Sequence, residues 1–476
     1  MEHHAILADD KRQYQKEQDH ILKTLIDYRF FNPWRHIESE VDDRALWNDS
    51  NLEIYITNQC NQNCEYCYLT KHSELYPSDK RDPELLLKNL RILYNYIMVN
   101  NFHIPTLDFF SGEIWHTKLG VDILRTTLDY IKKGMKINQI LIASNCSFVQ
   151  DDKSFHTIQS LINESLSMGT PIGFSISIDG KIMDEKMRPR NSSKPYTDEF
   201  YNKLFAFAKM NEFCFHPMIS SSNVKYWKEN YAWWEQMFEY YNIDLFRNLM
   251  MLEVRNDDWT DESIQDYCEF LKFLIEKFYE KGCNKDFELF ANTLAAVRDT
   301  DRTPNMSGYY PWLLNDNDTF LGCSITTNLT VRLGDLALCP CHRQAYDKYL
   351  FGYFNVENDK ITGIHATNPY MAMRIFMSNL HTTSPRCAQC IYNHCCLHGC
   401  MGSQIEANND PLFPIDGVCK MFKRKYAYLI QVYRDMGLID YYKKIDPEEY
   451  NTSLVKHILN LEKMEQEVRK NGMGES

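Results

Sequence analysis

The sequence lacks the features that would place the protein in a membrane or direct it to secretion. No uninterrupted apolar run among its 476 residues approaches the roughly 18 residues of a membrane span. The N-terminal segment, MEHHAILADDKRQYQKEQDH, is charged and has no apolar core, so it does not read as a signal peptide. We therefore expect a cytoplasmic protein.

A surplus of positive charge is also absent. The chain has 52 Lys and Arg residues against 65 Asp and Glu residues, a formal net charge of −13. This charge argues against a general role in binding nucleic acid or a membrane surface. Repeats of solenoid length and low-complexity tracts are missing as well. What remains is the composition of an ordinary globular protein, long enough for two or three domains.

Cysteine is abundant, yet one group of three cysteines lacks an obvious fourth partner. In a reducing compartment, 16 cysteines favour a metal framework over disulfides. Residues 60–67, the cysteine loop, read CNQNCEYC. Asn61 and Asn63 favour a turn over a helix interior. Three thiolates can hold a [4Fe–4S] cluster that leaves one iron open, whereas a zinc site would need a distant fourth ligand.

Strand-like and helix-like runs alternate from residue 51 to 258. This alternation predicts an α/β fold with a parallel sheet, either open or closed into a barrel, and a ligand site at the carboxyl ends of the strands. The predicted strands are 52–57, 106–111, 139–144, 172–178, 213–220 and 249–255. The other predicted regions are an N-terminal helical extension (1–50), a helical linker (259–320), a cysteine-rich domain (321–425) and a helical tail (426–476).

The cysteine loop resembles the C-x3-C-x2-C motif of radical S-adenosylmethionine (SAM) enzymes, with Tyr66 before the last cysteine. The resemblance implies a partial (β/α)6 TIM-like barrel in which Cys60, Cys64 and Cys67 hold a [4Fe–4S] cluster, with SAM on the open iron. One electron, supplied by a flavodoxin- or ferredoxin-type donor, would then cleave SAM to methionine and a 5′-deoxyadenosyl radical. That radical would abstract hydrogen from a substrate.

Later segments resemble the family's SAM-binding segments and occur in the expected order. Ser111-Gly112-Glu113 is similar to the family's Gly-Gly-Glu segment, which binds the SAM amino group, although serine replaces the first glycine. The family's usual His-Asp ahead of a carboxylate-binding arginine appears here as Met183-Asp184. The resemblance implies further SAM contacts by Tyr66, Ser144, Asn145, Ser177, Asp179 and Arg188, with Arg190 as the alternative arginine.

The C-terminal cysteines resemble the seven-cysteine SPASM extension, which usually holds two auxiliary [4Fe–4S] clusters. The resemblance assigns Cys387, Cys390, Cys396 and Cys419 to an outer cluster, and Cys323, Cys339 and Cys400 to an inner one. The inner cluster lacks a fourth cysteine, so an open iron, a carboxylate or Cys341 remains for that position. On spacing alone, two zinc knuckles are the alternative.

Enzymes with this double architecture mostly modify peptides. The resemblance implies an oxidoreductase of ribosomal-peptide maturation that forms thioether or carbon–carbon crosslinks in a precursor peptide. Sulfatase maturases, which make formylglycine, are the alternative; they carry Asp directly after the first-block cysteine, where this chain has Pro340. The first 50 residues are too few for a winged-helix leader-binding domain, so we expect leader recognition by a separate protein or by another surface of this chain.

A general base for the substrate is not singled out by the sequence. Glu253 is one candidate, although it could instead pair with Arg255 on the same strand face, and Cys341 is a candidate catalytic residue through its possible place on the inner cluster. A non-enzymatic iron–sulfur or zinc protein would account for the cysteines. It would leave the SAM-like segments of the α/β half without a role.

Overall fold

The computed structural model describes residues 51–76, 82–110, 112–190, 196–280, 328–350, 352–366, 400–410, 413–437 and residue 466. The predicted N-terminal extension lies outside these residues. So do Ser111 and four of the predicted cluster ligands: Cys323, Cys387, Cys390 and Cys396.

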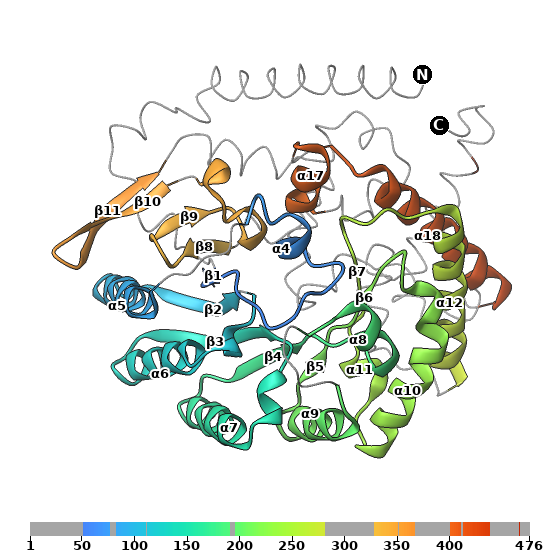
Figure 1. The fold of residues 1–476 in the computed structure, drawn as a ribbon, viewed down its shortest axis with the longest axis horizontal. Helices are drawn as coiled ribbons and strands as arrows, with labels where there is room; N and C mark the ends of the chain where they lie inside the picture. Colours follow the sequence, from blue (N-terminus) through green and yellow to red (C-terminus); the bar gives the residue numbers. More distant parts are fainter. Residues whose placement is uncertain are drawn as a thin grey trace.

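A mixed sheet organises the described residues (Figure 1), with strands in the order β11-β10-β9-β8-β1-β2-β3-β4-β5. Each pair of neighbours from β8 through β5 runs parallel, and β8 to β11 pair antiparallel. The predicted α/β class with a parallel sheet is confirmed. The strands are β1 (Asn51–Tyr55), β2 (His103–Phe110), β3 (Lys136–Ser144), β4 (Ile172–Ile176), β5 (Cys214–Phe215), β8 (Asn328–Arg332), β9 (Ala337–Cys339), β10 (Gly352–Glu357) and β11 (Lys360–Ala366).

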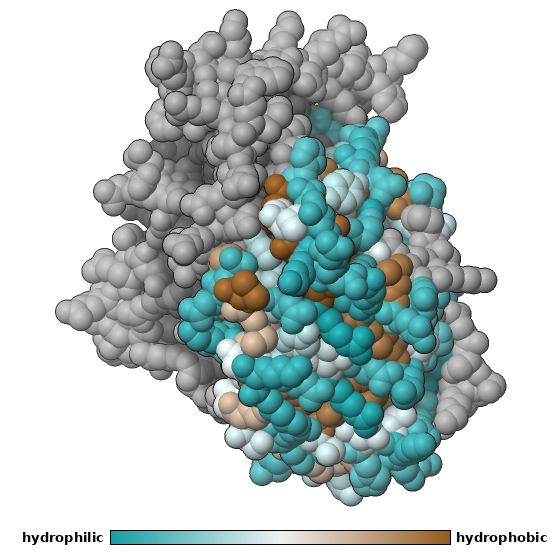
Figure 2. Space-filling view, turned by 90° about the vertical axis from the view of Figure 1, so that its left-hand side faces the viewer, coloured by the Kyte–Doolittle hydropathy of each residue, from teal (hydrophilic) through white to brown (hydrophobic). Residues whose placement is uncertain are grey.

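Helices connect the parallel strands and cover the outer side of the sheet (Figure 1). The longer ones are α5 (Pro83–Val99), α6 (Leu119–Lys132), α7 (Asp152–Ser167), α9 (Asp198–Asn211), α10 (Trp227–Tyr240), α12 (Asp261–Glu280) and α18 (Asp416–Asp435). Shorter ones are α4 (Tyr68–Lys71), α8 (Lys181–Met187), α11 (Leu245–Asn248) and α17 (Met401–Asn408). In the coloured part of the face in Figure 2, hydrophilic residues predominate and hydrophobic residues lie between them.

Helix α5 illustrates why these segments fold as they do. The Asp82 side chain accepts a hydrogen bond from the N–H of Glu84, and Pro83 occupies the first turn, which together start the helix. Leu86 and Leu90, four residues apart on one helix face, are buried in the core beneath the sheet. Each such leucine contributes about 1.5–3 kcal/mol by leaving water.

Strand alternation divides the sheet into two faces. Leu52 and Ile54 of β1 are fully buried in the core that the helices cover. Glu53 and Tyr55 therefore point to the opposite side, which we call the inner face. The parallel register places Glu53 beside Asp108, and Tyr55 beside Phe110. The inner face thus carries a pair of neighbouring carboxyl groups near the carboxyl ends of β1 and β2.

The predicted fifth strand, 213–220, is wrong as one continuous strand. It forms β5, which ends at Phe215, and β6 (Met218–Ile219), which pairs in parallel with β7 (Leu252–Glu253) in a separate two-stranded sheet. Pro217 lies between them and has no N–H for the ladder. The N–H of Met218 instead donates to the Asp179 carboxylate at 2.8 Å.

The described C-terminal segments share the sheet of the N-terminal α/β half and pack against it. β8 lies in parallel register along β1, with Leu329 beside Leu52 and Thr330 beside Glu53. Helix α18 spans the predicted boundary at residue 425, and Lys420 on it forms a 2.7 Å ion pair with Asp261 of α12. Among the described helices, none is long and apolar enough to cross a membrane.

Candidate functional site

The cysteine loop lies between β1 and α4, at the carboxyl end of the parallel strands. The residues that lead into the loop, 57–59, form backbone hydrogen bonds with the segment after β2. The N–H of Gly112 donates to Thr57 O at 2.8 Å, and the N–H of Glu113 donates to Gln59 O at 2.9 Å. A Cβ at Gly112 would lie 2.2 Å from the carbonyl oxygen of Gln59. Only glycine permits this approach, so the Gly-Glu segment lies directly against the chain that leads into Cys60.

Residues between Cys60 and Cys64 fasten the loop to neighbouring strand ends. The amide of Asn61 donates to Ser147 Oγ at 2.6 Å and accepts from Asn145 Nδ2 at 2.8 Å. The N–H of Asn63 donates to Pro189 O at 2.8 Å. The asparagines that predicted a turn therefore also hold that turn against the ends of β3 and α8.

Glu113, Ser144 and Asn145, three predicted SAM contacts, form one buried hydrogen-bonded group. Glu113 Oε1 accepts from Ser144 Oγ at 2.9 Å and from the N–H of Trp115 at 3.2 Å, and Oε2 accepts from the N–H of Asn145 at 2.7 Å. Burial raises the pKa of Glu113, and these donors oppose it. A carboxylate offers about four acceptor positions, so Oε2 keeps one for a further donor.

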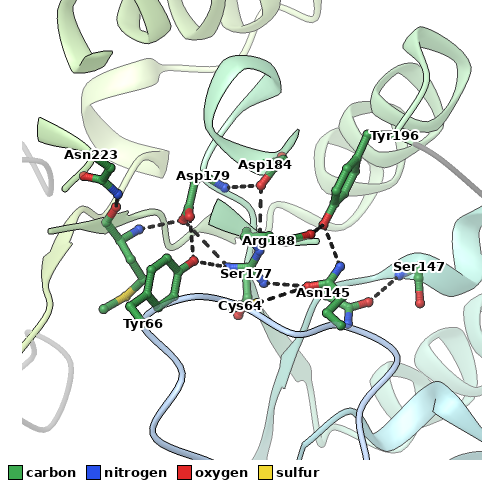
Figure 3. Close-up of polar contacts among 12 residues, drawn as sticks. Cys64, Tyr66, Asn145, Ser147, Ser177, Asp179, Asp184, Arg188, Tyr196 and Asn223 are labelled. Atoms are coloured by element: carbon green, nitrogen blue, oxygen red, sulfur yellow. Dashed lines mark hydrogen bonds and ion pairs between the residues drawn. The ribbon is translucent and has the colours of Figure 1, made fainter. Parts of the chain in front are cut away.

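A second group joins the cysteine loop to the end of β4 (Figure 3). Tyr66 O–H donates to Asp179 Oδ2 at 2.5 Å, and Arg188 NH1 donates to the Tyr66 oxygen at 2.7 Å. The guanidinium also lies 3.7 Å from Asp179 and 3.7 Å from Asp184. The N–H of Asp179 in turn donates to Asp184 Oδ1 at 2.8 Å. Tyr66, Asp179 and Arg188, which the sequence predicts as SAM contacts, are therefore brought together.

Charge in this second group is balanced by one cation. Burial, and then the neighbouring Asp179, raise the pKa of Asp184 to about 7, while Arg188 opposes the shift. Burial also raises the pKa of Asp179 against the pull of Arg188. The Nε of Arg188 is buried and makes no hydrogen bond among the described residues, and it faces Asp184 Oδ1 at 3.7 Å. The positive charge of the guanidinium could still attract an anionic ligand.

The remaining predicted SAM contact, Ser177, follows β4. Its N–H donates to Ser144 O at 2.8 Å, and its hydroxyl lies 3.5 Å from Ser175 O. Arg190, the alternative arginine, donates to Gln150 Oε1 at 2.6 Å and stacks over the ring of Tyr196. Arg190 is thus engaged outside the Tyr66–Asp179 group, which leaves Arg188 as the arginine beside the loop.

The thiols of the cysteine loop fit the donor set of an iron–sulfur cluster. Cys60, Cys64 and Cys67 form no disulfide. Burial first, and Glu113 second, raise the pKa of Cys60 to about 12; burial does the same for Cys64 against the effect of Arg188. Metal loading must therefore displace protons. In the described part, no three His, Cys, Asp or Glu side chains already enclose a metal position. Three thiols on one loop, beside a buried arginine, suit a cluster with one open iron.

Four predicted auxiliary ligands fall within the described residues. Cys339 ends β9 and is buried against Tyr55 and Ala345, Cys341 follows it, Cys400 directly precedes α17, and Cys419 lies in α18. Their partners Cys323, Cys387, Cys390 and Cys396 lie outside, so the auxiliary clusters stay a prediction.

Two residues after Cys341 connect the C-terminal cysteines to the cysteine loop, and sequence reasoning gave neither a role. His342 Nδ1 lies 2.9 Å from Glu53 Oε2, and its ring stacks on Phe110 at 3.7 Å. Arg343 forms a bidentate ion pair with Glu406 of α17 and stacks over the ring of Tyr68, the residue after Cys67. The only sequence signal for these two roles was that a histidine and an arginine follow the two cysteines in CPCHR, residues 339–343.

Glu253, a predicted base, lies in a buried ion-pair cluster. Its carboxylate is 2.7 Å from Lys425 Nζ, 2.8 Å from the Tyr267 hydroxyl and 3.6 Å from Arg255. Burial alone would raise its pKa, but Lys425 and Arg255 lower it overall. A carboxylate held this way is a weak base, and the alternative pairing with Arg255 is found in the structure.

Sequence comparison identifies one distant relative. No protein-family model matches the chain. "Uncharacterized protein MJ0907" of Methanocaldococcus jannaschii is 24% identical over 182 residues, which are 37% of this chain. The match spans 56% of that protein, so the chain corresponds to about half the length of the curated relative.

Solved structures give a stronger likeness. A histidine-tagged form of anSMEcpe with bound AdoMet has a TM-score of 0.53 at 16% identity, and the match covers 86% of this chain and 98% of that one. "Native anSMEcpe with bound AdoMet and Cp18Cys peptide" has a TM-score of 0.50 at 17% identity, covering 82% and 99%. Streptococcus suis SuiB bound to precursor peptide SuiA has a TM-score of 0.48 at 12% identity, covering 78% and 76%. The chain thus has the fold of AdoMet-bound anSMEcpe, an anaerobic sulfatase-maturating enzyme, and the predicted resemblance to radical SAM enzymes is confirmed at the level of the fold.

Proposed function

We propose that the protein is a radical SAM peptide maturase. The observation that carries this proposal is the convergence of the cysteine loop with two buried polar groups at the carboxyl ends of the parallel strands, on the fold of an AdoMet-bound enzyme. A zinc-stabilised binding module would need neither the loop's open coordination nor these groups.

In this proposal Cys60, Cys64 and Cys67 hold a [4Fe–4S] cluster. When bound, the cluster supplies the electron that cleaves SAM into methionine and a 5′-deoxyadenosyl radical. Arg188 offers its positive charge to the SAM carboxylate, and Glu113 offers its remaining Oε2 acceptor position to the SAM amino group. Both residues are held by protein partners before the ligand arrives, so little orientation is lost on binding.

We infer that the substrate is a ribosomally made precursor peptide, in which hydrogen abstraction leads to an intrapeptide thioether or carbon–carbon crosslink. Support for a peptide comes from anSMEcpe, which is recorded with bound AdoMet and the Cp18Cys peptide. The C-terminal cysteines, Cys341 among them, are proposed to hold two auxiliary clusters. A separate leader-recognition protein and a flavodoxin- or ferredoxin-type donor complete the proposed set of partners.

Formylglycine formation is the second candidate, because the structures that share this fold belong to a sulfatase maturase. Pro340, at the position where such maturases carry Asp, disfavours it. Incubating the protein with SAM and a candidate peptide separates the two: a hydrazide reagent captures the aldehyde of formylglycine, whereas a crosslinked product lacks an aldehyde and resists linear fragmentation in tandem mass spectrometry.

SAM cleavage tests the central claim without a known peptide. Anaerobically reconstituted and reduced protein should bind about four irons at the loop and convert SAM to 5′-deoxyadenosine. A variant with Cys60, Cys64 and Cys67 all replaced by alanine should not. Cys214→Ala, which removes a cysteine from β5, is the matched control and should behave as the wild type. Equal cleavage by the triple variant, or near-stoichiometric zinc with little iron in the wild type, would overturn the proposal.

A further inference from the structure

Gln62, in the middle of the cysteine loop, makes contacts that its place between two motif cysteines does not require. Its side chain is buried, with 5% of the residue exposed. The amide oxygen accepts from Arg188 NH2 at 3.2 Å and from Cys64 Sγ at 3.6 Å. The amide nitrogen donates to the Tyr196 hydroxyl at 2.7 Å. One amide therefore touches the predicted SAM-carboxylate partner and a predicted cluster ligand at once.

Further contacts fix the orientation of this amide. The Tyr196 hydroxyl that accepts from Gln62 donates onward to the carbonyl oxygen of Arg188 at 3.1 Å. The Gln62 backbone pairs as an antiparallel bridge with Arg190, and its N–H points at Cys60 Sγ at 3.4 Å. The amide cannot be flipped without placing two donors together at Arg188, so its oxygen must face the guanidinium.

We propose that Gln62 is a positioning residue that couples the SAM-binding arginine to the cluster. By accepting a hydrogen bond from Arg188 NH2 while its own backbone N–H points at Cys60 Sγ, it sets the orientation of the guanidinium relative to the cysteine loop. It also keeps that positive charge at a fixed distance from the cluster. This inference rests on the proposed SAM chemistry. It adds a residue that aligns the SAM-binding arginine with the cluster.

Glutamine suits this position better than its close relatives. Glutamate has the same shape, but it would form an ion pair with Arg188, and it has no N–H for the Tyr196 hydroxyl. Methionine fills the same volume and makes none of these hydrogen bonds. The two replacements separate the effect of charge from the effect of alignment.

The test uses reconstituted, iron-loaded protein and two readouts besides turnover: the dissociation constant for SAM and the midpoint reduction potential of the loop cluster by spectroscopic titration. Gln62→Met should weaken SAM binding by about tenfold, the effect of losing one hydrogen bond to a charged group. Gln62→Glu should shift the potential to more negative values, because it adds a negative charge beside the cluster. Glu65→Gln, an exposed charge change in the same loop, is the control and should match the wild type in both readouts.

Outcomes distinguish this inference from the proposed function. If the wild type neither binds SAM nor cleaves it, the proposed function fails and the coupling falls with it. If the wild type is active and both Gln62 variants match it in SAM affinity and potential, the coupling alone is wrong. If Gln62→Met does not load iron, Tyr196→Phe replaces it: loss of the hydroxyl that orients the amide should weaken SAM binding in the same direction, and unchanged affinity overturns the inference.

Discussion

Replacing Arg188 by methionine should destabilise the protein by an amount that depends strongly on pH. The guanidinium is the one cation that the described residues place within 4 Å of both Asp179 and Asp184, whose side chains are fully buried. Without it, at least one more carboxyl group must either remain charged in a buried site or take up a proton.

Protonation of a buried carboxyl group sets an upper limit on the loss in the free energy of unfolding. An unfolded aspartate has a pKa of about 3.9, and each pH unit above that value costs about 1.4 kcal/mol to keep it protonated. For one added proton the limit is about 4 kcal/mol at pH 7 and about 1.5 kcal/mol at pH 5. The value at pH 7 falls within the roughly 3–5 kcal/mol that breaking a buried ion pair usually costs.

Urea unfolding of wild type and Arg188→Met at pH 7 and pH 5 measures both values. Lys186→Met, on the exposed side of α8 two residues before Arg188, is the matched control and should change the free energy of unfolding by less than about 0.5 kcal/mol at either pH. The free energy of unfolding of Arg188→Lys should lie between those of the wild type and Arg188→Met, because an ammonium keeps the charge but cannot bond Tyr66 and Gln62 in one plane. An equal loss at the two pH values, or none at pH 7, would refute the reasoning.

Three further predictions concern the site's surroundings. Gly112→Ala should weaken SAM binding more than tenfold, measured by equilibrium dialysis, since its Cβ would lie 2.2 Å from Gln59 O; unchanged affinity would contradict the close approach. Burial lowers the pKa of His216 to about 4, so the unfolded chain takes up this proton first as pH falls from about 6.5, and stability is lost down to pH 4. His216→Gln should avoid up to about 3 kcal/mol of that loss in urea unfolding at pH 7 and 4.5, and an equal acid loss would count against it. Lys425→Met should cost about 3–5 kcal/mol because it leaves Glu253 buried without its nearest cation, and adding Glu253→Gln should recover part; a loss below 1 kcal/mol would show the pair to be dispensable.

The parallel half of the fold could be predicted because its signal is local. The segment 139–144 contains the apolar run ILIA, and 172–178, IGFSISI, has apolar residues at alternate positions; the structure has β3 and β4 there. The fifth strand failed for a local reason too. Pro217 interrupts a run that is otherwise rich in apolar residues, and because proline has no N–H for the ladder, the strand ends before it.

The site could be predicted to the extent that its residues follow strand ends. Tyr66 belongs to the β1–β2 connection, and Asp179 and Arg188 belong to the β4–β5 connection. Parallel strands bring these two connections to one edge, so their meeting follows from topology. Gln62 could not be predicted in the same way. Its position in the motif is not defined by the family resemblance, and its amide gains meaning only once Arg188 and Tyr196 are placed around it.

The pairing of β8 with β1 is the feature that sequence could least supply, and it determines charge on the inner face. Thr330 and His342 come from far along the chain, and both bind the carboxylate of Glu53. Burial alone would raise the pKa of Glu53, but these partners lower it overall. Asp108, its neighbour across the β1–β2 register, has no such partners among the described residues, and burial together with the Glu53 charge raises its pKa well above the usual range. The partners of Glu53, which lie beside Cys339 and Cys341, thus leave two adjacent carboxyl groups with pKa values shifted in opposite directions. The C-terminal cysteine region therefore contributes to the electrostatics of the parallel sheet itself, and removing it should change the inner face beside the cysteine loop as well as any cluster that it holds.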